Sequence, residues 1–132
     1  MSATTAGATW RVVIAEDDPD IRALVSIAVK RAGLDLVTEA VDGGAAFEAV
    51  ARLHPDLAVL DVSMPTMTGL EVCRAVRADP TLDTVRLILL SAGVDDHAKA
   101  LGLAAGADEY YIKPFSPKAL AARLTELMED SK

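Results

Sequence analysis

Hydrophobic residues recur along this chain in two alternating rhythms. Short, nearly continuous apolar runs are typical of buried β-strands, and the stretches between them space their apolar residues as amphipathic helices do. Five such runs predict strands over Arg11–Ala15, Leu36–Glu39, Asp56–Asp61, Arg86–Ser91 and Asp108–Ile112. The second run is more polar, so we expect that strand near an edge of the sheet.

Helix start and stop signals separate these runs. Asp18-Pro19 and Ser116-Pro117 each combine an N-cap residue with a proline at the first helical position. Gly33 and Gly106 close the first and fourth helical stretches. Five helices are therefore predicted, marked by apolar residues at Ile21, Leu24, Val25, Ala28 and Val29; Phe47, Val50 and Ala51; Val72, Cys73 and Val76; Ala98, Leu101, Ala104 and Ala105; and Leu120, Leu124, Leu127 and Met128.

This alternation predicts the fold class. Strands that alternate with helices at this spacing imply right-handed crossovers and a parallel sheet, and helices on both faces explain why the strands are so apolar. We expect an α/β fold built on a five-stranded parallel doubly wound sheet, in a chain whose 132 residues fit one domain. In such sheets the chemistry gathers at the carboxyl ends of the strands.

Composition and charge limit the class of protein and its expected location. Hydrophobic residues make up 52% of the chain and charged residues 25%, which is a globular balance. A net charge of −7 argues against direct nucleic-acid binding and suits a cation site. Cys73 is the only cysteine, so we expect no intrachain disulfide and a reducing, cytoplasmic location. No signal peptide and no membrane-spanning stretch of roughly 20 apolar residues is recognisable, so no membrane association is expected.

Polar residues follow four of the five predicted strands. Glu16 and Asp17 follow the first strand, Asp61 ends the third, Ser91 ends the fourth and Lys113 follows the fifth. Any one of them could be a solvated loop residue, but together they place three carboxylates, a hydroxyl and an ammonium on one rim of the sheet.

Carboxylates crowded into one pocket repel one another, and a divalent cation resolves that repulsion. Mg²⁺ prefers oxygen ligands and is typically held by a few carboxylates together with a phosphate. Asp61 ends the most apolar strand, so it is the candidate nucleophile that would form an acyl phosphate. Lys113 would supply positive charge for phosphoryl transfer, and Ser91 could donate a hydrogen bond to a phosphoryl oxygen.

Four motifs that contain these residues resemble the receiver domains of bacterial two-component response regulators. The motifs are E-D-D-P-D-I-R (Glu16–Arg22), L-D-V-S-M-P-T-M-T-G-L-E (Leu60–Glu71), L-L-S-A (Leu89–Ala92) and G-A-D-E-Y-Y-I-K-P-F (Gly106–Phe115). The resemblance runs from about Trp10 to about Met128 and implies a flavodoxin-like strand order of 2-1-3-4-5. It divides the chain into an N-terminal extension (1–9), a receiver domain (10–129) and a tail (130–132).

The resemblance also implies roles for individual residues. Asp61 would accept the phosphoryl group, and Mg²⁺ would be the cofactor. The expected metal ligands are Glu16, Asp17, Asp61 and the backbone carbonyl of Ser63, with Asp17 the direct ligand of the acidic pair.

Four further residues match the family's motifs. Lys113 would pair with the phosphoryl group, and Pro114 would follow a cis peptide bond. Ser91 would be the switch hydroxyl and Tyr110 the switch aromatic.

The implied biology is that of a phosphoprotein switch and not of an enzyme with an external product. A sensor histidine kinase or a histidine phosphotransfer protein would be the donor, and an effector protein or domain would read the result. A homodimer is also conceivable, because charged residues near the last strand and helix could form salt bridges between two copies. These residues are Asp108, Glu109, Lys118, Arg123 and Glu126.

Other functions remain open from the sequence. A flavodoxin-like cofactor binder would use the same fold, although Glu16 and Asp17 repel phosphate unless a cation intervenes. An aspartate-based phosphatase usually keeps a second acid two residues after its nucleophile, where this chain has Ser63. The chain could also be one piece of a larger regulator or hybrid kinase.

Overall fold

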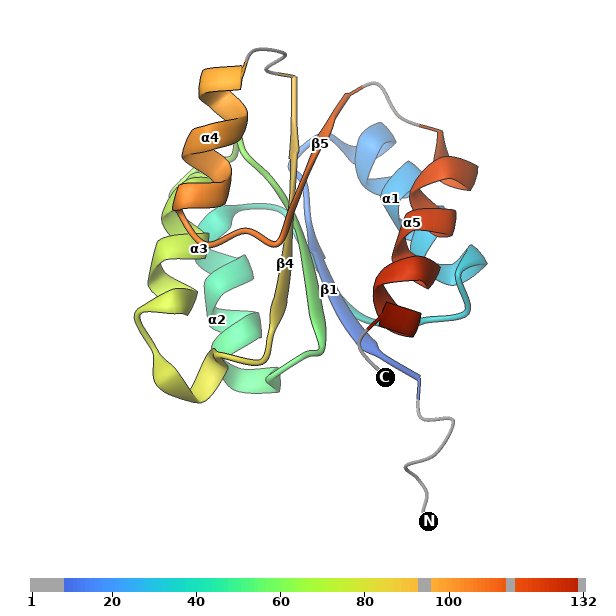
Figure 1. Cartoon of the computed structure of the whole chain (residues 1–132), viewed down its shortest axis with the longest axis horizontal. Coiled ribbons are helices and arrows are strands. Elements are labelled where there is room, and N and C mark those ends of the chain that lie inside the picture. Colours follow the sequence, from blue (N-terminus) through green and yellow to red (C-terminus); the bar gives the residue numbers. More distant parts are fainter. Residues whose placement is uncertain (1–8, 93–95, 114–115, 131–132) are drawn as a thin grey trace.

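Five parallel strands lie side by side in the order β2-β1-β3-β4-β5 in the computed structural model of the chain (Figure 1). The structure describes residues 9–92, 96–113 and 116–130. The strands are β1 (Arg11–Ala15), β2 (Asp35–Ala40), β3 (Leu57–Asp61), β4 (Arg86–Ser91) and β5 (Glu109–Ile112). The sheet is parallel and has the predicted order, with β3 at its centre and the polar β2 at an edge.

Helices cover both faces of this sheet. Figure 1 shows α2, α3 and α4 on one side and α1 and α5 on the other. Their bounds are α1 (Pro19–Arg31), α2 (Gly43–Leu53), α3 (Gly69–Arg77), α4 (Asp96–Ala104) and α5 (Pro117–Asp130), with a short 3₁₀ turn, η1 (Pro80–Leu82), before β4. Asp18 caps α1, as predicted, by accepting hydrogen bonds from the amides of Asp20 and Ile21.

The two faces of the sheet bury two separate cores. Leu87 and Leu89 of β4 lie in the core under α2 and α3, whereas Ile88 and Leu90 lie in the core under α1 and α5. A fully buried Leu or Ile side chain contributes about 1.5–3 kcal/mol through the hydrophobic effect. Cys73 lies in the first core, where burial raises the pKa of its thiol to about 12, so it is a packing residue and not a reactive thiol.

Strand pairing brings the carboxyl ends to one edge of the sheet. Ala15 pairs with Leu60, Asp61 with Leu90, and Ser91 with Ile112. The polar residues that follow these strands therefore share one rim, as the sequence predicts. Within the described part of the chain, no helix has the length and apolar character needed to cross a membrane.

Candidate functional site

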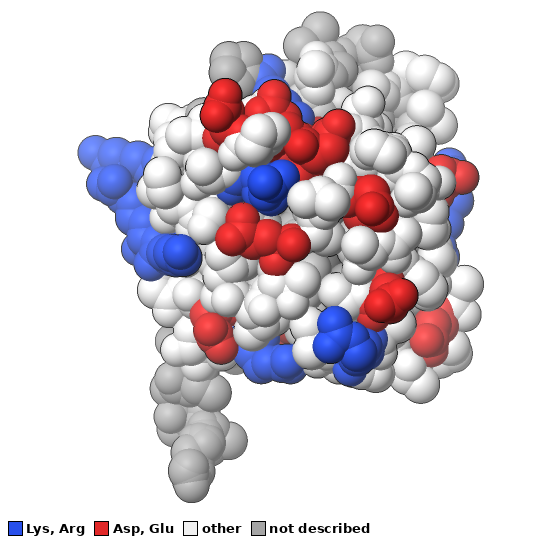
Figure 2. All heavy atoms as spheres, turned by 180° about the vertical axis from the view of Figure 1, so that it is seen from behind, with Lys and Arg blue, Asp and Glu red and all other residues white. Residues whose placement is uncertain are grey.

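Three carboxylates converge where β1 and β3 end. Glu16, Asp17 and Asp61 each place one carboxylate oxygen within 4.8 Å of the others. Glu16 and Asp61 are almost fully buried, with 1% and 3% of their surface exposed, while Asp17 is exposed. Figure 2 shows acidic side chains gathered in the upper part of the face it views, towards the end of the molecule at which the strands end in Figure 1.

Lys113 bridges the two buried carboxylates. Its Nζ lies 2.9 Å from Oε1 of Glu16 and 2.6 Å from Oδ1 of Asp61. The backbone fixes the position of Lys113, because its amide donates to the carbonyl of Ser91 at 2.7 Å. Burial alone would lower the pKa of Lys113, but its hydrogen bonds to Asp61 and Glu16 outweigh burial and raise that pKa.

One ammonium does not fully compensate the acidic groups. Burial raises the pKa of Asp61 and of Glu16 above their usual values, although Lys113 opposes both shifts. The charge of Asp17 raises the pKa of Asp61 further. A hard divalent cation such as Mg²⁺ prefers oxygen ligands, and its charge would offset the repulsion among these crowded carboxylates, whose pKa values are raised.

Glu16 is held in place by the start of α1. The amide of Asp18 donates to Oε2 of Glu16 at 3.1 Å, and Nη1 of Arg22 donates to the Glu16 carbonyl at 3.0 Å. Arg22 also lies 3.7 Å from the carboxylate of Glu39 on β2. The sequence identified Asp18 only as a cap, because its contact with Glu16 depends on the turn between β1 and α1.

The loop after β3 closes tightly against Asp61. The Ser63 amide opposes the rise in the pKa of the Asp61 carboxyl, and the Gly69 amide donates to the Val62 carbonyl at 2.9 Å. A Cβ at Gly69 would lie 2.5 Å from the Asp61 carbonyl oxygen, so this position accepts only glycine without a backbone shift. Sequence reasoning missed Gly69, although a glycine that opens a helix beside the nucleophile could have signalled a close backbone approach.

Ser91 and Tyr110 lie on the neighbouring strands. Ser91 is buried at the end of β4, one residue beyond the partner of Asp61 in the strand register. Tyr110 is half-buried against the core under α2 and α3. A Cβ at Gly102 would lie 2.8 Å from Cδ2 of Tyr110, which places the tyrosine ring directly against α4. Pro114, predicted to follow a cis peptide bond, lies outside the described residues.

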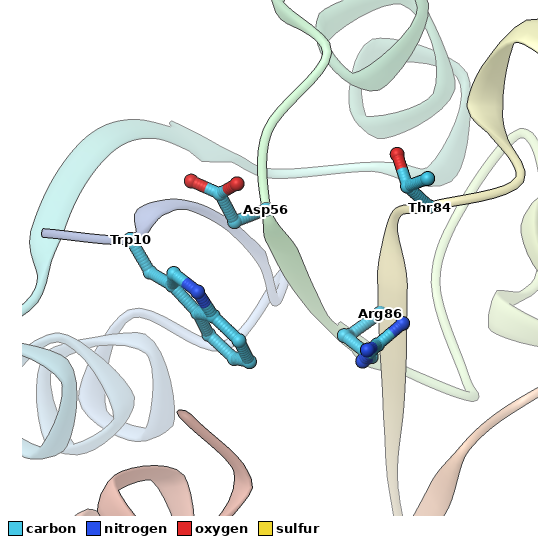
Figure 3. A pocket seen from close by; sticks show the side chains of 4 residues that line it. All are labelled: Trp10, Asp56, Thr84 and Arg86. Carbon is cyan, nitrogen blue, oxygen red and sulfur yellow. The ribbon is translucent and has the colours of Figure 1, made fainter. Parts of the chain in front are cut away.

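A pocket lies at the opposite end of the sheet from the carboxylate cluster. Trp10, Asp56, Thr84 and Arg86 line it (Figure 3), all at or just before the amino ends of β1, β3 and β4. None of the predicted site residues lines it, so it is separate from the carboxylate cluster.

Comparisons with known proteins agree with this geometry. The family model of the response regulator receiver domain matches residues 12–125. The chain is 40% identical over 114 residues to the DNA-binding response regulator MtrA of Mycolicibacterium smegmatis, a match that covers 86% of this chain and 48% of that protein. The chain thus spans about half the length of the curated relatives it matches.

Solved structures give the same result. The receiver domain of the Francisella response regulator 1452 superposes with a TM-score of 0.84 at 30% identity, covering 94% of this chain and all of that one. The BeF3-activated DrrB receiver domain superposes with a TM-score of 0.77 at 30% identity, covering 92% of this chain and 99% of that one. With this fold, this cluster of residues and these matches, the chain belongs to the response regulator receiver domain family.

Proposed function

We propose that this chain is a phosphorylation-controlled switch whose Asp61 accepts a phosphoryl group in a Mg²⁺-dependent reaction. The observation that carries the proposal is the position of Asp61: a buried carboxylate at the end of the central strand, 2.6 Å from Lys113 and beside two further acids. Membership of the receiver family favours this function over a cofactor binder or a phosphatase.

The chemistry assigned to Asp61 is nucleophilic. A carboxylate oxygen of Asp61 attacks the phosphorus of a phosphohistidine, an O–P bond forms as the P–N bond breaks, and the bonding electrons leave with the imidazole nitrogen. Lys113 neutralises part of the charge on Asp61 before the reaction and pairs with the phosphoryl oxygens after it. The chain catalyses only its own phosphorylation and dephosphorylation and has no external product.

The acidic cluster is the proposed metal site. Glu16, Asp17 and Asp61 would hold Mg²⁺ together with the backbone carbonyl of Ser63. When bound, the ion supplies positive charge that offsets the repulsion among the carboxylates and the phosphoryl oxygens. The exposed position of Asp17 leaves it free to meet a partly hydrated cation, which supports its role as a direct ligand.

Ser91 and Tyr110 are the proposed transmission path. New phosphoryl oxygens beside β4 draw the Ser91 hydroxyl towards them, and the packing of Tyr110 against α4 changes in response. Both packings exist before phosphorylation, and the phosphoryl group shifts their populations by its differential interaction energy. A downstream effector would read the resulting change on the surface of α4, β5 and α5.

The relatives suggest which partners act with this switch. We infer that a sensor histidine kinase or a histidine phosphotransfer protein donates the phosphoryl group in the cytoplasm. MtrA is described as DNA-binding, and the chain covers only about half of it. The effector is therefore proposed to be a DNA-binding domain, in the same polypeptide or in another, while the acidic receiver itself does not bind nucleic acid.

Intact-mass measurement tests the assignment of Asp61. Acetyl phosphate and Mg²⁺ should add one phosphoryl group to the wild-type chain and none to Asp61→Asn. Asp35→Asn, which changes an exposed aspartate at the start of β2, is the matched control and should still gain the group. Phosphorylation that persists in Asp61→Asn would assign the acceptor to another residue.

A further inference from the structure

The loop that follows Asp61 is fastened to the amino end of α2 by Thr66. The hydroxyl of Thr66 accepts a hydrogen bond from the Gly44 amide at 2.8 Å and donates to Oδ1 of Asp42 at 3.1 Å. Asp42 also accepts from the Ala45 amide at 2.8 Å, as the N-cap of α2. The Ala45 amide and the Thr66 hydroxyl together hold the pKa of the Asp42 carboxyl below its usual range. Thr66 thus completes the cap of a helix distant from it in sequence.

The backbone at this contact is unusual. Thr66 has a φ of +66°, in the left-handed region that a β-branched residue rarely adopts. Beside it, the Gly43 amide donates to the Pro65 carbonyl at 3.1 Å. A Cβ at Gly43 would lie 1.9 Å from the Met67 carbonyl oxygen, so the loop and the helix meet backbone to backbone. A strained conformation of this kind persists only where surrounding contacts enforce it.

The same loop forms one wall of the phosphorylation site. At the start of the loop, the Ser63 amide acts to lower the pKa of the Asp61 carboxyl, and at its end the Gly69 amide donates to the Val62 carbonyl. Between these two points, Pro65 and Thr66 tie the loop to the start of α2, and Thr68 ties it to α3 through hydrogen bonds with Glu71. Losing the Thr66 contacts therefore loosens the segment that presents Ser63 to Asp61.

We propose that Thr66 is a positioning residue for the phosphorylation site: its hydroxyl fixes the loop after β3 on α2 and thereby sets the affinity of the acidic cluster for a divalent cation. This inference rests on the function proposed for Asp61. It differs from a structural role because it predicts a change in cation binding at a distance from the altered side chain.

Three variants separate the hydroxyl from the backbone. Thr66→Val keeps the shape and loses the hydroxyl, Thr66→Ser keeps the hydroxyl, and Thr66→Gly loses the hydroxyl while relieving the left-handed backbone. Thr81→Val is the matched control, because the Thr81 hydroxyl also donates to an aspartate cap, Asp79, at 2.7 Å, but at η1.

Three measurements follow the expected effect from the Thr66 hydrogen bonds to the cation site. In metal-free protein, hydrogen exchange of the Gly44 amide should accelerate in Thr66→Val and Thr66→Gly, and stay slow in Thr66→Ser and Thr81→Val. Titration with Mg²⁺, followed by backbone chemical shifts, should show roughly tenfold weaker binding in the two variants that lack the Thr66 hydroxyl, as for other residues that orient metal ligands. Their phosphorylation by acetyl phosphate at limiting Mg²⁺ should slow in proportion.

The outcomes are distinguishable. If the wild-type chain gains no phosphoryl group at Asp61, the proposed function fails. If the wild type is phosphorylated but Thr66→Gly binds Mg²⁺ as tightly, or Gly44 exchanges equally in all variants, Thr66 does not position the site and only this inference is overturned.

Discussion

At the scale of single residues, the site contains charges that the fold itself disfavours. Burial raises the pKa of Asp61 above its ordinary value of 3.8, so the folded chain binds this proton more tightly than the unfolded chain does. The stability that depends on this group is fully present below the ordinary pKa and is lost as pH rises through the raised one. Near neutral pH the Asp61 carboxylate therefore destabilises the cation-free fold.

Neutralising this carboxylate should stabilise the chain. In the absence of divalent cations, Asp61→Asn should unfold at a higher temperature than the wild type at neutral pH. The gain should shrink as pH falls towards 3.8, where the wild-type carboxyl is itself protonated. Thermal unfolding followed by circular dichroism across this range measures the difference, with Asp35→Asn as the control. A lower midpoint for Asp61→Asn at neutral pH would contradict this prediction.

His54, far from the site, has a strained backbone conformation. His54 caps the carboxyl end of α2 with φ 47° and ψ 60°, the left-handed conformation that glycine adopts without a Cβ penalty. Its side chain is exposed and its amide donates to Val50 at 3.0 Å, a bond that glycine would keep. His54→Gly should raise the free energy of unfolding by about 0.5–1 kcal/mol. Glycine removes the steric penalty of the left-handed conformation but adds an entropic cost, and the net gain is the difference between the two. Chemical denaturation measures this, and His54→Ala, which retains a Cβ, should show no such gain.

At the scale of elements, α4 and β5 meet through a glycine. The Tyr110 ring fills the space that a side chain at Gly102 would need. Gly102→Ala should therefore displace the ring and alter the chemical shifts of Tyr110 and Leu89 without any phosphoryl group. Leu103→Ala, on an exposed position of the same helix, should leave those shifts unchanged. If the Tyr110 chemical shifts match those of the wild type, the added methyl group has displaced α4 and not the tyrosine ring.

The elements themselves were largely predictable. The strands β1 and β4 begin and end as predicted, because their apolar runs are bounded by charged or polar residues. β2 is longer than predicted, since Asp35 pairs with Arg11 at an edge where a polar residue costs little. The 3₁₀ turn η1 was not predicted, because its Asp79 cap and its proline leave no periodic pattern in so short a segment.

The site residues followed from the strand ends, but their supporting contacts did not. The convergence of Glu16, Asp17 and Asp61 is a property of parallel strands and could be foreseen. The cap that Thr66 completes on α2 joins residues 22 to 24 positions apart and depends on a left-handed backbone, which no local pattern encodes.

At the scale of the whole molecule, cation binding and folding are linked. A ligand that binds only the folded chain stabilises it, by about 2.7 kcal/mol when its concentration is a hundred times its Kd. Excess Mg²⁺ should therefore raise the unfolding temperature of the wild type, and Asp17→Ala should lose most of this rise. Asp20→Ala, which removes an exposed acid from the first turn of α1, should respond like the wild type. An equal rise in Asp17→Ala would move the metal site elsewhere.

Several of the charged residues that could join two copies are already partnered within one chain. Arg123 makes two hydrogen bonds of 3.0 Å to Glu109, and Arg77 lies 3.0 Å from Asp108. A homodimer built on these residues would have to exchange internal pairs for intermolecular ones. Dimerisation through them stays a prediction that the internal pairing makes less favourable.

The position of Trp10 has a spectroscopic consequence. This single tryptophan precedes β1 and packs on the core under α1 and α5, at the far end of the strand from the carboxylates. The length of β1 separates the two by roughly 15–20 Å. Its emission should report loss of the fold while remaining constant through phosphorylation, so the protein carries a built-in optical reference against which probes placed near Tyr110 can be normalised.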